Sequence, residues 1–183
     1  RASLIALDQM EGGGLKPDVV VPLLDAADPV IKDTAWWIAA NHPEWGSALA
    51  GYFKRHLAAT DISAGQRDDL EQKLVRFGEN SSIQELLASM VEGAASKDER
   101  LTALRIMSRT RAKELPSIWV SPLVGVMAGP DAEITRQAVT VVRAAPASKE
   151  GATAFQGALL RIARETGLPA EVRLDALAAI PGG

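Results

Sequence analysis

The side chains best suited to acid–base or metal chemistry in this chain are two histidines, His42 and His56. They stand 14 residues apart on different predicted elements. They therefore cannot form the histidine pair, one helical turn apart, of an H-x-x-x-H metal site. We expect His42, which precedes Pro43, to bond the backbone at a helix junction, and His56 to lie at a helix end that favours cations. Neither pattern indicates a general base.

Carboxylates gather at two places, Asp68-Asp69 with Glu71 and Asp98-Glu99. Both places lie near the starts of predicted helices, where the helix dipole favours negative charge. A glycosidase-type pair would need two carboxylates facing each other across a cleft, and this spacing does not call for one. We interpret both groups as helix-terminal charge.

Gly12-Gly13-Gly14 resembles a phosphate-binding loop only superficially, because no strand pattern precedes it and no Gly-Lys-Ser/Thr follows it. A run of glycines is costly in a helix, so we expect it to end one. No serine has the paired His and Asp of a catalytic triad. The chain has no cysteine, which excludes disulfides, thiolate catalysis and Cys-bound zinc or haem within it. We therefore predict no catalytic, cofactor-binding or metal-binding residue in this segment.

Aromatic side chains cluster within 18 residues, and Trp36, Trp37, Trp45 and Tyr52 form the candidate interaction surface, with Phe53 beside them. One interpretation places them in the core between repeats. The other makes them an aromatic anchor for a neighbouring domain or partner, since Trp and Tyr dominate interface hot spots.

The positions of Trp36 and Trp37 on their predicted helix help to distinguish a core role from an exposed one. Ile31, Ala35 and Ile38 share one face of it, at spacings of four and three residues. Trp36 and Trp37 lie on the flanks of that face, about 100° apart. We expect Trp37 to pack against the next repeat and Trp36 to lie closer to solvent.

Composition favours helices. Of 183 residues, 47% are hydrophobic but only 4% are aromatic, and alanine, the best helix former, is abundant. The net charge of −3 leaves no basic stripe of the kind that nucleic-acid binding needs. One local exception is the stretch from Arg100 to Lys113, which we interpret as a solvated helix face. The chain has no run of about 20 apolar residues, so we predict no membrane insertion.

Capping and stop signals divide the chain into about eleven helices with no confident strand. Asp28 precedes Pro29 as an N-cap, and capping boxes begin at Ser63, Ser82 and Ser96. The triplet at 19–21 is Val-Val-Val and fits a strand by itself, but the next residue is proline. The helices are expected at about residues 4–10, 17–27, 29–40, 43–59, 64–78, 83–94, 97–111, 117–128, 131–144, 149–166 and 170–180.

A short sequence motif recurs through these helices, in which an apolar residue is followed four positions later by a small residue that we expect to be buried. The marker residues are separated by 29, 39, 29, 35 and 38 residues. They are Ala6, Ala35, Ala103, Ala138 and Ala176, with Leu74 at the centre of a weaker sixth copy between Ala35 and Ala103. Repeats of this period indicate stacked helical hairpins. We predict an all-α, α-α superhelix of about five hairpins, forming one domain over 1–183, with the loop at 60–65 as the best candidate hinge.

The segment from Val21 to Ala35, with V-P-L-L-D and then D-P-V-I-K-D-T-A, resembles the HEAT-repeat pattern of a V-P-x-L helix, a D-P-x-V-R turn and an Ala-rich helix. Residues 120–138 and 169–177 resemble it again, and residues 66–95 fit poorly. The resemblance implies an armadillo-like α solenoid and says almost nothing of function.

The first third of the chain is similar to the helical-repeat region of PVC-type haem-binding proteins. The resemblance lies in residues 2–10, 12–15, 34–38 and 42–46. These are bacterial multidomain proteins often labelled membrane-bound dehydrogenases. The resemblance implies a longer parent, with a propeller-like domain before the repeats, a C-x-x-C-H haem site after them, and an extracytoplasmic or periplasmic location. The first residue, Arg1, and the half-repeat at the end also lead us to expect an excised piece.

Three functions stay open. The first is a non-catalytic scaffold that binds protein or neighbouring domains of its own chain. The second is an enzyme or nucleic-acid-processing module of base-excision type, which would need a basic concave face and a pocket. The third is a peptide-binding groove along the second helices of the hairpins.

Overall fold

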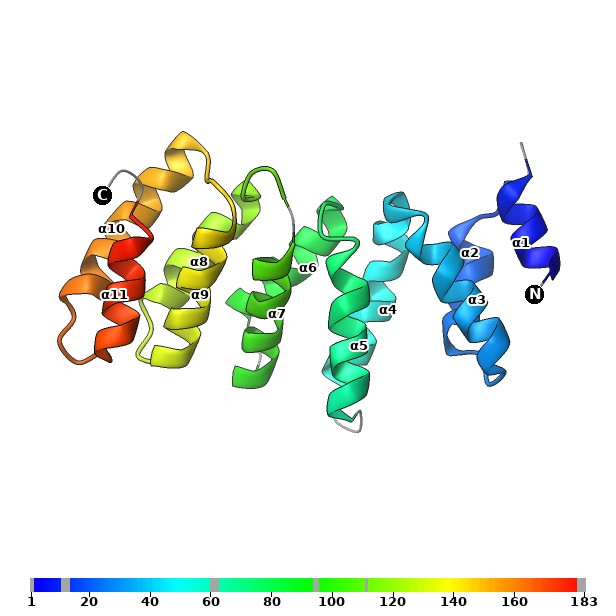
Figure 1. The fold of residues 1–183 in the computed structure, drawn as a ribbon, viewed down its shortest axis with the longest axis horizontal. Coiled ribbons are helices and arrows are strands. Elements are labelled where there is room, and N and C mark those ends of the chain that lie inside the picture. Colours follow the sequence, from blue (N-terminus) through cyan, green and yellow to red (C-terminus); the bar gives the residue numbers. More distant parts are fainter. Residues whose placement is uncertain (1, 11–13, 60–62, 94–95, 111, 181–183) are drawn as a thin grey trace. The chain divides into compact units, whose positions relative to one another are not determined.

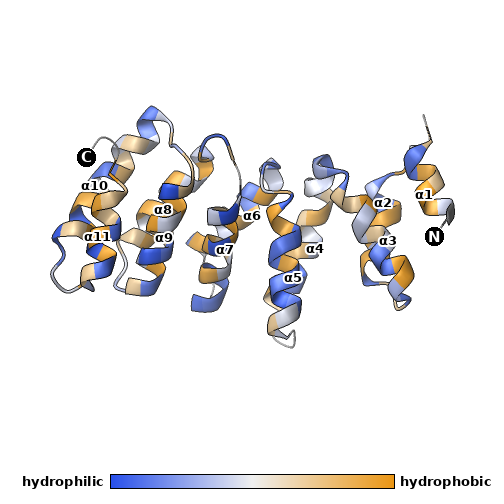
Figure 2. Ribbon diagram, in the orientation of Figure 1, coloured by the Kyte–Doolittle hydropathy of each residue, from blue (hydrophilic) through white to orange (hydrophobic). Residues whose placement is uncertain are grey.

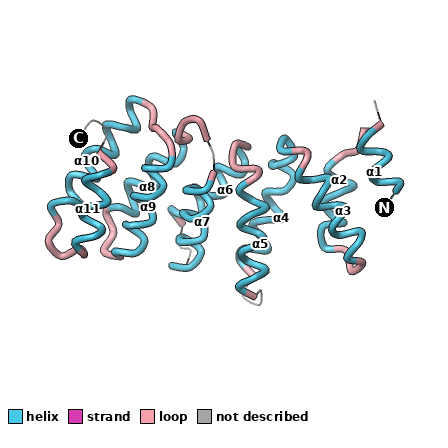
Figure 3. The backbone as a smooth tube through the Cα atoms, in the orientation of Figure 1, coloured by secondary structure: helices cyan, strands magenta, loops and turns pink. Residues whose placement is uncertain are grey.

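The computed structural model describes residues 2–10, 14–59, 63–93, 96–110 and 112–180. Within these ranges the chain forms eleven α-helices and no strand, so the all-α prediction is confirmed (Figures 1 and 3). The α-helices are α1 (Ala2–Gln9), α2 (Pro17–Val20), α3 (Pro29–Ala40), α4 (Gly46–Ala58), α5 (Ala64–Val75), α6 (Ser81–Glu92), α7 (Lys97–Arg109), α8 (Val120–Met127), α9 (Ala132–Ala144), α10 (Lys149–Arg164) and α11 (Ala170–Ala178). Three short 3-10 helices accompany them: η1 (Val21–Asp25), η2 (Pro43–Trp45) and η3 (Ser117–Trp119).

Side-chain caps begin several helices where the sequence predicted them. The Asp28 carboxylate accepts a hydrogen bond from the Val30 N–H at 2.8 Å. Ser63 and Ser96 begin α5 and α7 with complete capping boxes. The box predicted at Ser82 is wrong, because α6 begins at Ser81 and the side chain of Asn80 accepts from the Ser82 N–H at 3.0 Å.

Two of the expected helices contain a 3-10 segment in place of continuous α-helix. A continuous helix was expected at 17–27, but α2 ends at Val20 and η1 follows it. Pro22 lacks the N–H that a continuing α-helix would need, so the backbone tightens to 3-10 geometry. The helix expected at 43–59 likewise begins with a 3-10 turn, η2, and α4 follows it from Gly46.

The chain forms two compact units, residues 1–83 (unit 1) and residues 84–183 (unit 2), which divide within α6. The expectation of a single repeat domain stays a prediction. Of the loop expected as a hinge, residues 60–62 lie outside the described residues, as do Gly12 and Gly13 of the expected helix terminator.

In unit 2 the helices pack in an alternating order (Figure 1). Helix α9 packs between α7 and α11, while α8 contacts α9 and α10, and α10 contacts α11. Trp119 anchors η3 in this unit, because its ring is fully buried and its Nε1–H donates to the Gln84 carbonyl at 3.0 Å. In unit 1, α3 contacts α1, α2 and η1, and α4 contacts η1 and α5.

The marker residues test the repeat pattern directly. Five of the six are completely buried: Ala35, Leu74, Ala103, Ala138 and Ala176. Ala6 is exposed, so the expectation of burial is wrong there. Figure 2 shows apolar and polar residues mixed along the helices, as expected of helices buried on one side.

Candidate protein-contact surface

The predicted aromatic group lies in unit 1 and is mostly core. Trp36, Tyr52 and Phe53 contact one another, with ring centroids 5.4 to 6.0 Å apart, and Phe77 adds a fourth ring 5.9 Å from Phe53. Such edge-on and tilted pairs add stability beyond the area that they bury. Trp36, Tyr52 and Phe53 are buried, and so is Trp45, so these residues hold α3, α4 and the end of α5 together.

Trp37 is the exception, with 48% of its surface exposed against 7% for Trp36. The sequence-based expectation for these two residues is therefore reversed. Both tryptophans lie about 130° from the middle of the face formed by Ile31, Ala35 and Ile38, one on each side of it. Helical periodicity cannot choose between them. The rings of α4 fill the space on the Trp36 side and leave Trp37 outside.

Two hollows flank Trp37, each with a volume of about 470 Å³. The α1–α3 hollow is lined by Trp37 with Ile5, Gln9, Val30 and Asp33, among others. We call the second one the α3–α5 hollow, because Trp36, Trp37 and Asn41 line it from α3 and its C-cap, and Asp69, Gln72, Lys73 and Arg76 line it from α5 and its C-cap. Trp37 with these two hollows forms what we call the Trp37 surface.

The α3–α5 hollow carries opposite charges of unequal number. Lys73 Nζ lies 4.3 Å from the centre of the Trp36 ring and forms an ion pair with Asp69. Arg76 is exposed, and its side chain has no ion-pair partner among the described residues. The hollow therefore has one uncompensated positive charge.

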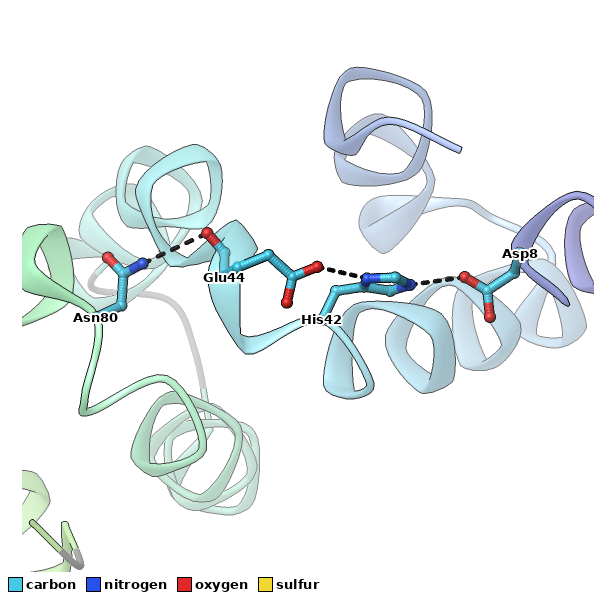
Figure 4. Close-up of polar contacts among 4 residues, drawn as sticks. All are labelled: Asp8, His42, Glu44 and Asn80. Atoms are coloured by element: carbon cyan, nitrogen blue, oxygen red, sulfur yellow. Dashed lines mark hydrogen bonds and ion pairs between the residues drawn. The ribbon is translucent and has the colours of Figure 1, made fainter. Parts of the chain in front are cut away.

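His42 connects elements of unit 1, and Figure 4 shows both of its polar contacts. Its Nε2 lies 2.8 Å from Asp8 Oδ1 of α1, and its Nδ1 lies 2.6 Å from Glu44 Oε1 of η2. The expected bond to the backbone is therefore wrong. The imidazole also stacks on Trp45, with the ring centres 4.1 Å apart and the planes 8° apart.

Both contacts of His42 need an N–H, and a neutral imidazole has only one. Partial burial lowers the pKa of His42, but the hydrogen bonds and charges of Asp8 and Glu44 outweigh it. The pKa of His42 is thereby raised above its ordinary 6.5. The arrangement favours an imidazolium that links α1 to the turn after α3.

His56 takes part in a similar link through Asp25, the last residue of η1. Asp25 accepts from the Tyr52 hydroxyl at 3.0 Å, and its other carboxylate oxygen lies 3.0 Å from His56 Nε2. Burial, and then this bond to Asp25, raise the pKa of the Tyr52 phenol well above its usual range. Because Tyr52 stays a protonated donor, the group ties η1 to α4.

Several of the other charged residues have structural contacts. Glu99 completes the capping box of Ser96, and Arg100 donates to the Gly93 carbonyl at 2.7 Å. Arg105 donates to Thr102 at 2.9 Å within α7. Among the described residues, no group of three or more His, Cys, Asp and Glu side chains could hold a metal ion.

No family model matches the chain, and no curated protein matches it either. Across the described ranges, every helix is too short or too polar to span a bilayer.

Proposed function

We propose that this chain is a non-catalytic helical-repeat module that binds protein, and that it does so through the Trp37 surface. One observation carries the proposal: Trp37 is half exposed between two hollows while the aromatic rings around it are buried. An indole held on a rigid helix gives a large contact area at little cost in conformational entropy. Tryptophan is accordingly enriched among residues that dominate binding energy.

The repeat architecture belongs to the same proposal. The alternating packing of α7 to α11 within unit 2 supports stacked hairpins of HEAT type, and so do the five buried marker residues. In such an array each hairpin covers its apolar side with the next, and one face is left for binding. From these two observations we also propose that all the helices stack as five hairpins.

The biological setting rests on the sequence resemblance alone. We propose that the segment belongs to a larger bacterial haem-binding, dehydrogenase-like protein, in which it contacts neighbouring domains. The chain has no cysteine, so a covalently attached haem would lie elsewhere in that protein. The full reading frame tests this: a C-x-x-C-H site downstream supports it, and a complete gene of this length contradicts it.

Peptide selection tests the Trp37 surface. Random short peptides displayed on phage are selected on the immobilised chain, and the enriched peptides are then titrated against Trp37→Ala. Val19→Ala is the matched control, since Val19 is 52% exposed in the same unit and lines neither hollow. We expect Trp37→Ala to weaken binding by about tenfold or more, as for a hot-spot residue, and Val19→Ala to change it by less than about twofold. Equal binding to both variants, or no enriched peptide at all, contradicts the proposal.

A further inference from the structure

The two sides of the α3–α5 hollow differ in character. On the α3 side, Trp37 offers an apolar indole face that is half exposed. On the α5 side, Lys73 is already paired with Asp69, while the guanidinium of Arg76 has no ionic partner among the described residues. A ligand that fits both sides has an apolar group next to a negative charge.

Polar groups without partners mark the same hollow. Trp36 contributes to its lining, and the buried Nε1–H of Trp36 has no acceptor within the described part of the chain. The exposed amide side chains of Asn41 and Gln72 are likewise without hydrogen bonds to described residues. Asn41 and Gln72 can therefore hydrogen-bond a ligand that enters the hollow, whereas the Trp36 Nε1–H is enclosed by the protein.

We propose that the α3–α5 hollow binds an acidic peptide segment, with a carboxylate on Arg76 and an adjacent large apolar side chain against Trp37. This inference rests on the proposed function and names the chemistry of its partner. An arginine guanidinium matches a carboxylate in two parallel hydrogen bonds, which makes the pairing directional as well as attractive.

Charge decides between this ligand and a nucleic acid. The hollow holds a single uncompensated cation, Arg76, since Asp69 is paired with Lys73, and the whole chain has a net charge of −3. A nucleic-acid backbone needs a row of cations that follows its phosphates. One carboxylate next to an apolar side chain suits one arginine next to one tryptophan.

The test uses peptides enriched on the whole chain, each paired with a version in which Asp and Glu are replaced by Asn and Gln. Both versions are titrated by fluorescence anisotropy against the unaltered chain, Arg76→Gln and Arg55→Gln. Arg55 is the matched control, because it is an exposed arginine in the last turn of α4 and does not line the hollow. Circular dichroism of each variant checks that it is folded.

We expect Arg76→Gln to weaken the acidic peptide by about tenfold and Arg55→Gln by less than about twofold. The amide peptide should bind the unaltered chain and Arg76→Gln equally, because the pair that the substitution removes is already absent. Enriched peptides without acidic residues, or an acidic peptide indifferent to Arg76→Gln, overturn this inference. If those peptides still lose binding in Trp37→Ala, the proposed function survives.

A labelled oligo-dT strand serves as the competing ligand. Binding of this strand that depends on Arg76 and exceeds that of the acidic peptides would overturn the inference in favour of a nucleic acid. If no peptide binds the unaltered chain, the proposed function is overturned together with this inference.

Discussion

His42 Nε2 lies 2.8 Å from Asp8 Oδ1, which joins the turn after α3 to the first helix of the chain (Figure 4). Only 8% of the Asp8 side chain and 28% of the His42 side chain are exposed to solvent. In sequence the two residues are 34 positions apart. The packing of α1 against the rest of unit 1 therefore depends in part on the protonation of the His42 imidazole.

The first prediction concerns pH. The pKa of His42 is raised in the folded chain, so its contribution to stability is complete below its unfolded value of about 6.5 and is lost as pH rises through the folded value. We expect NMR titration of the imidazole protons to place His42 above 6.5, and hydrogen exchange of α1 amides to be faster at pH about 8 than at pH about 6 after correction for intrinsic rates. His56→Gln assigns the two histidine signals. A His42 pKa at or below 6.5 contradicts the prediction.

The second prediction removes the partner of His42. Asp8→Asn replaces a charged acceptor by a neutral one, so the pKa of His42 should fall toward 6.5. The free energy of unfolding at pH about 6 should fall by about 1 kcal/mol. Urea denaturation measures the second effect, and Asp18→Asn, on an exposed aspartate of α2, is the control. An unchanged His42 pKa would show that Asp8 does not stabilise the imidazolium.

The third prediction concerns a close contact at the start of α4. A Cβ atom on Gly46 would lie 2.6 Å from the Cβ of Asn80, which is closer than real side chains come. We expect Gly46→Ala to lower the free energy of unfolding by about 2 kcal/mol through overpacking.

Gly51→Ala is the matched control on the same helix, because a Cβ there meets nothing within 4 Å. It should be neutral or raise stability by about 0.5 to 1 kcal/mol, since alanine favours a helix over glycine. Equal effects of the two substitutions in thermal unfolding would argue against the Asn80 contact.

The fourth prediction concerns the N-cap of α9 in unit 2. Asp131 accepts from the N–H groups of Glu133 and Ile134 at 3.0 and 3.2 Å, and it pairs with Lys97 at 3.0 Å. Lys97 first, and then the Ile134 N–H, hold the pKa of Asp131 below its usual range. Its contribution is therefore present above the unfolded pKa and is lost as pH falls through the folded one.

Asp131→Ala should lower the free energy of unfolding at neutral pH by about 1 kcal/mol, as for other caps. Glu133→Ala is the control, because it keeps the cap and removes only the second contact of Lys97, at 2.8 Å. A cap that contributes nothing would make the two variants equally stable in urea.

Residues that act within their own helix were predictable. Asp28, Ser63 and Ser96 cap helices as expected, because a cap depends on residues two or three positions away. Four-residue spacing likewise placed Ala35, Ala103, Ala138 and Ala176 inside, since a helix has a fixed period. The exception, Ala6, shows that periodicity names a face and does not say whether another element covers it.

The Trp37 surface was only partly predictable. The aromatic cluster is visible in the sequence, but the expected exposure of Trp36 and Trp37 was reversed, and a backbone partner was expected for His42. Arg76 and Asn80 carried no signal that would have singled them out. Each depends on residues that are distant in sequence, such as Asn80 beside Gly46 and the α5 residues beside Trp37.

The sequence by itself determined that this chain is helical, where most of its helices begin and end, and which face of each is apolar, because these properties come from neighbours within a few positions. Tertiary structure decided that Trp36 is buried and Trp37 exposed, that His42 lies between two carboxylates, and that Arg76 shares a hollow with an indole. The physical reason is that two positions equivalent on an isolated helix differ only once other elements pack against one of them. Burial, charge pairing and the shape of a binding surface arise from that packing.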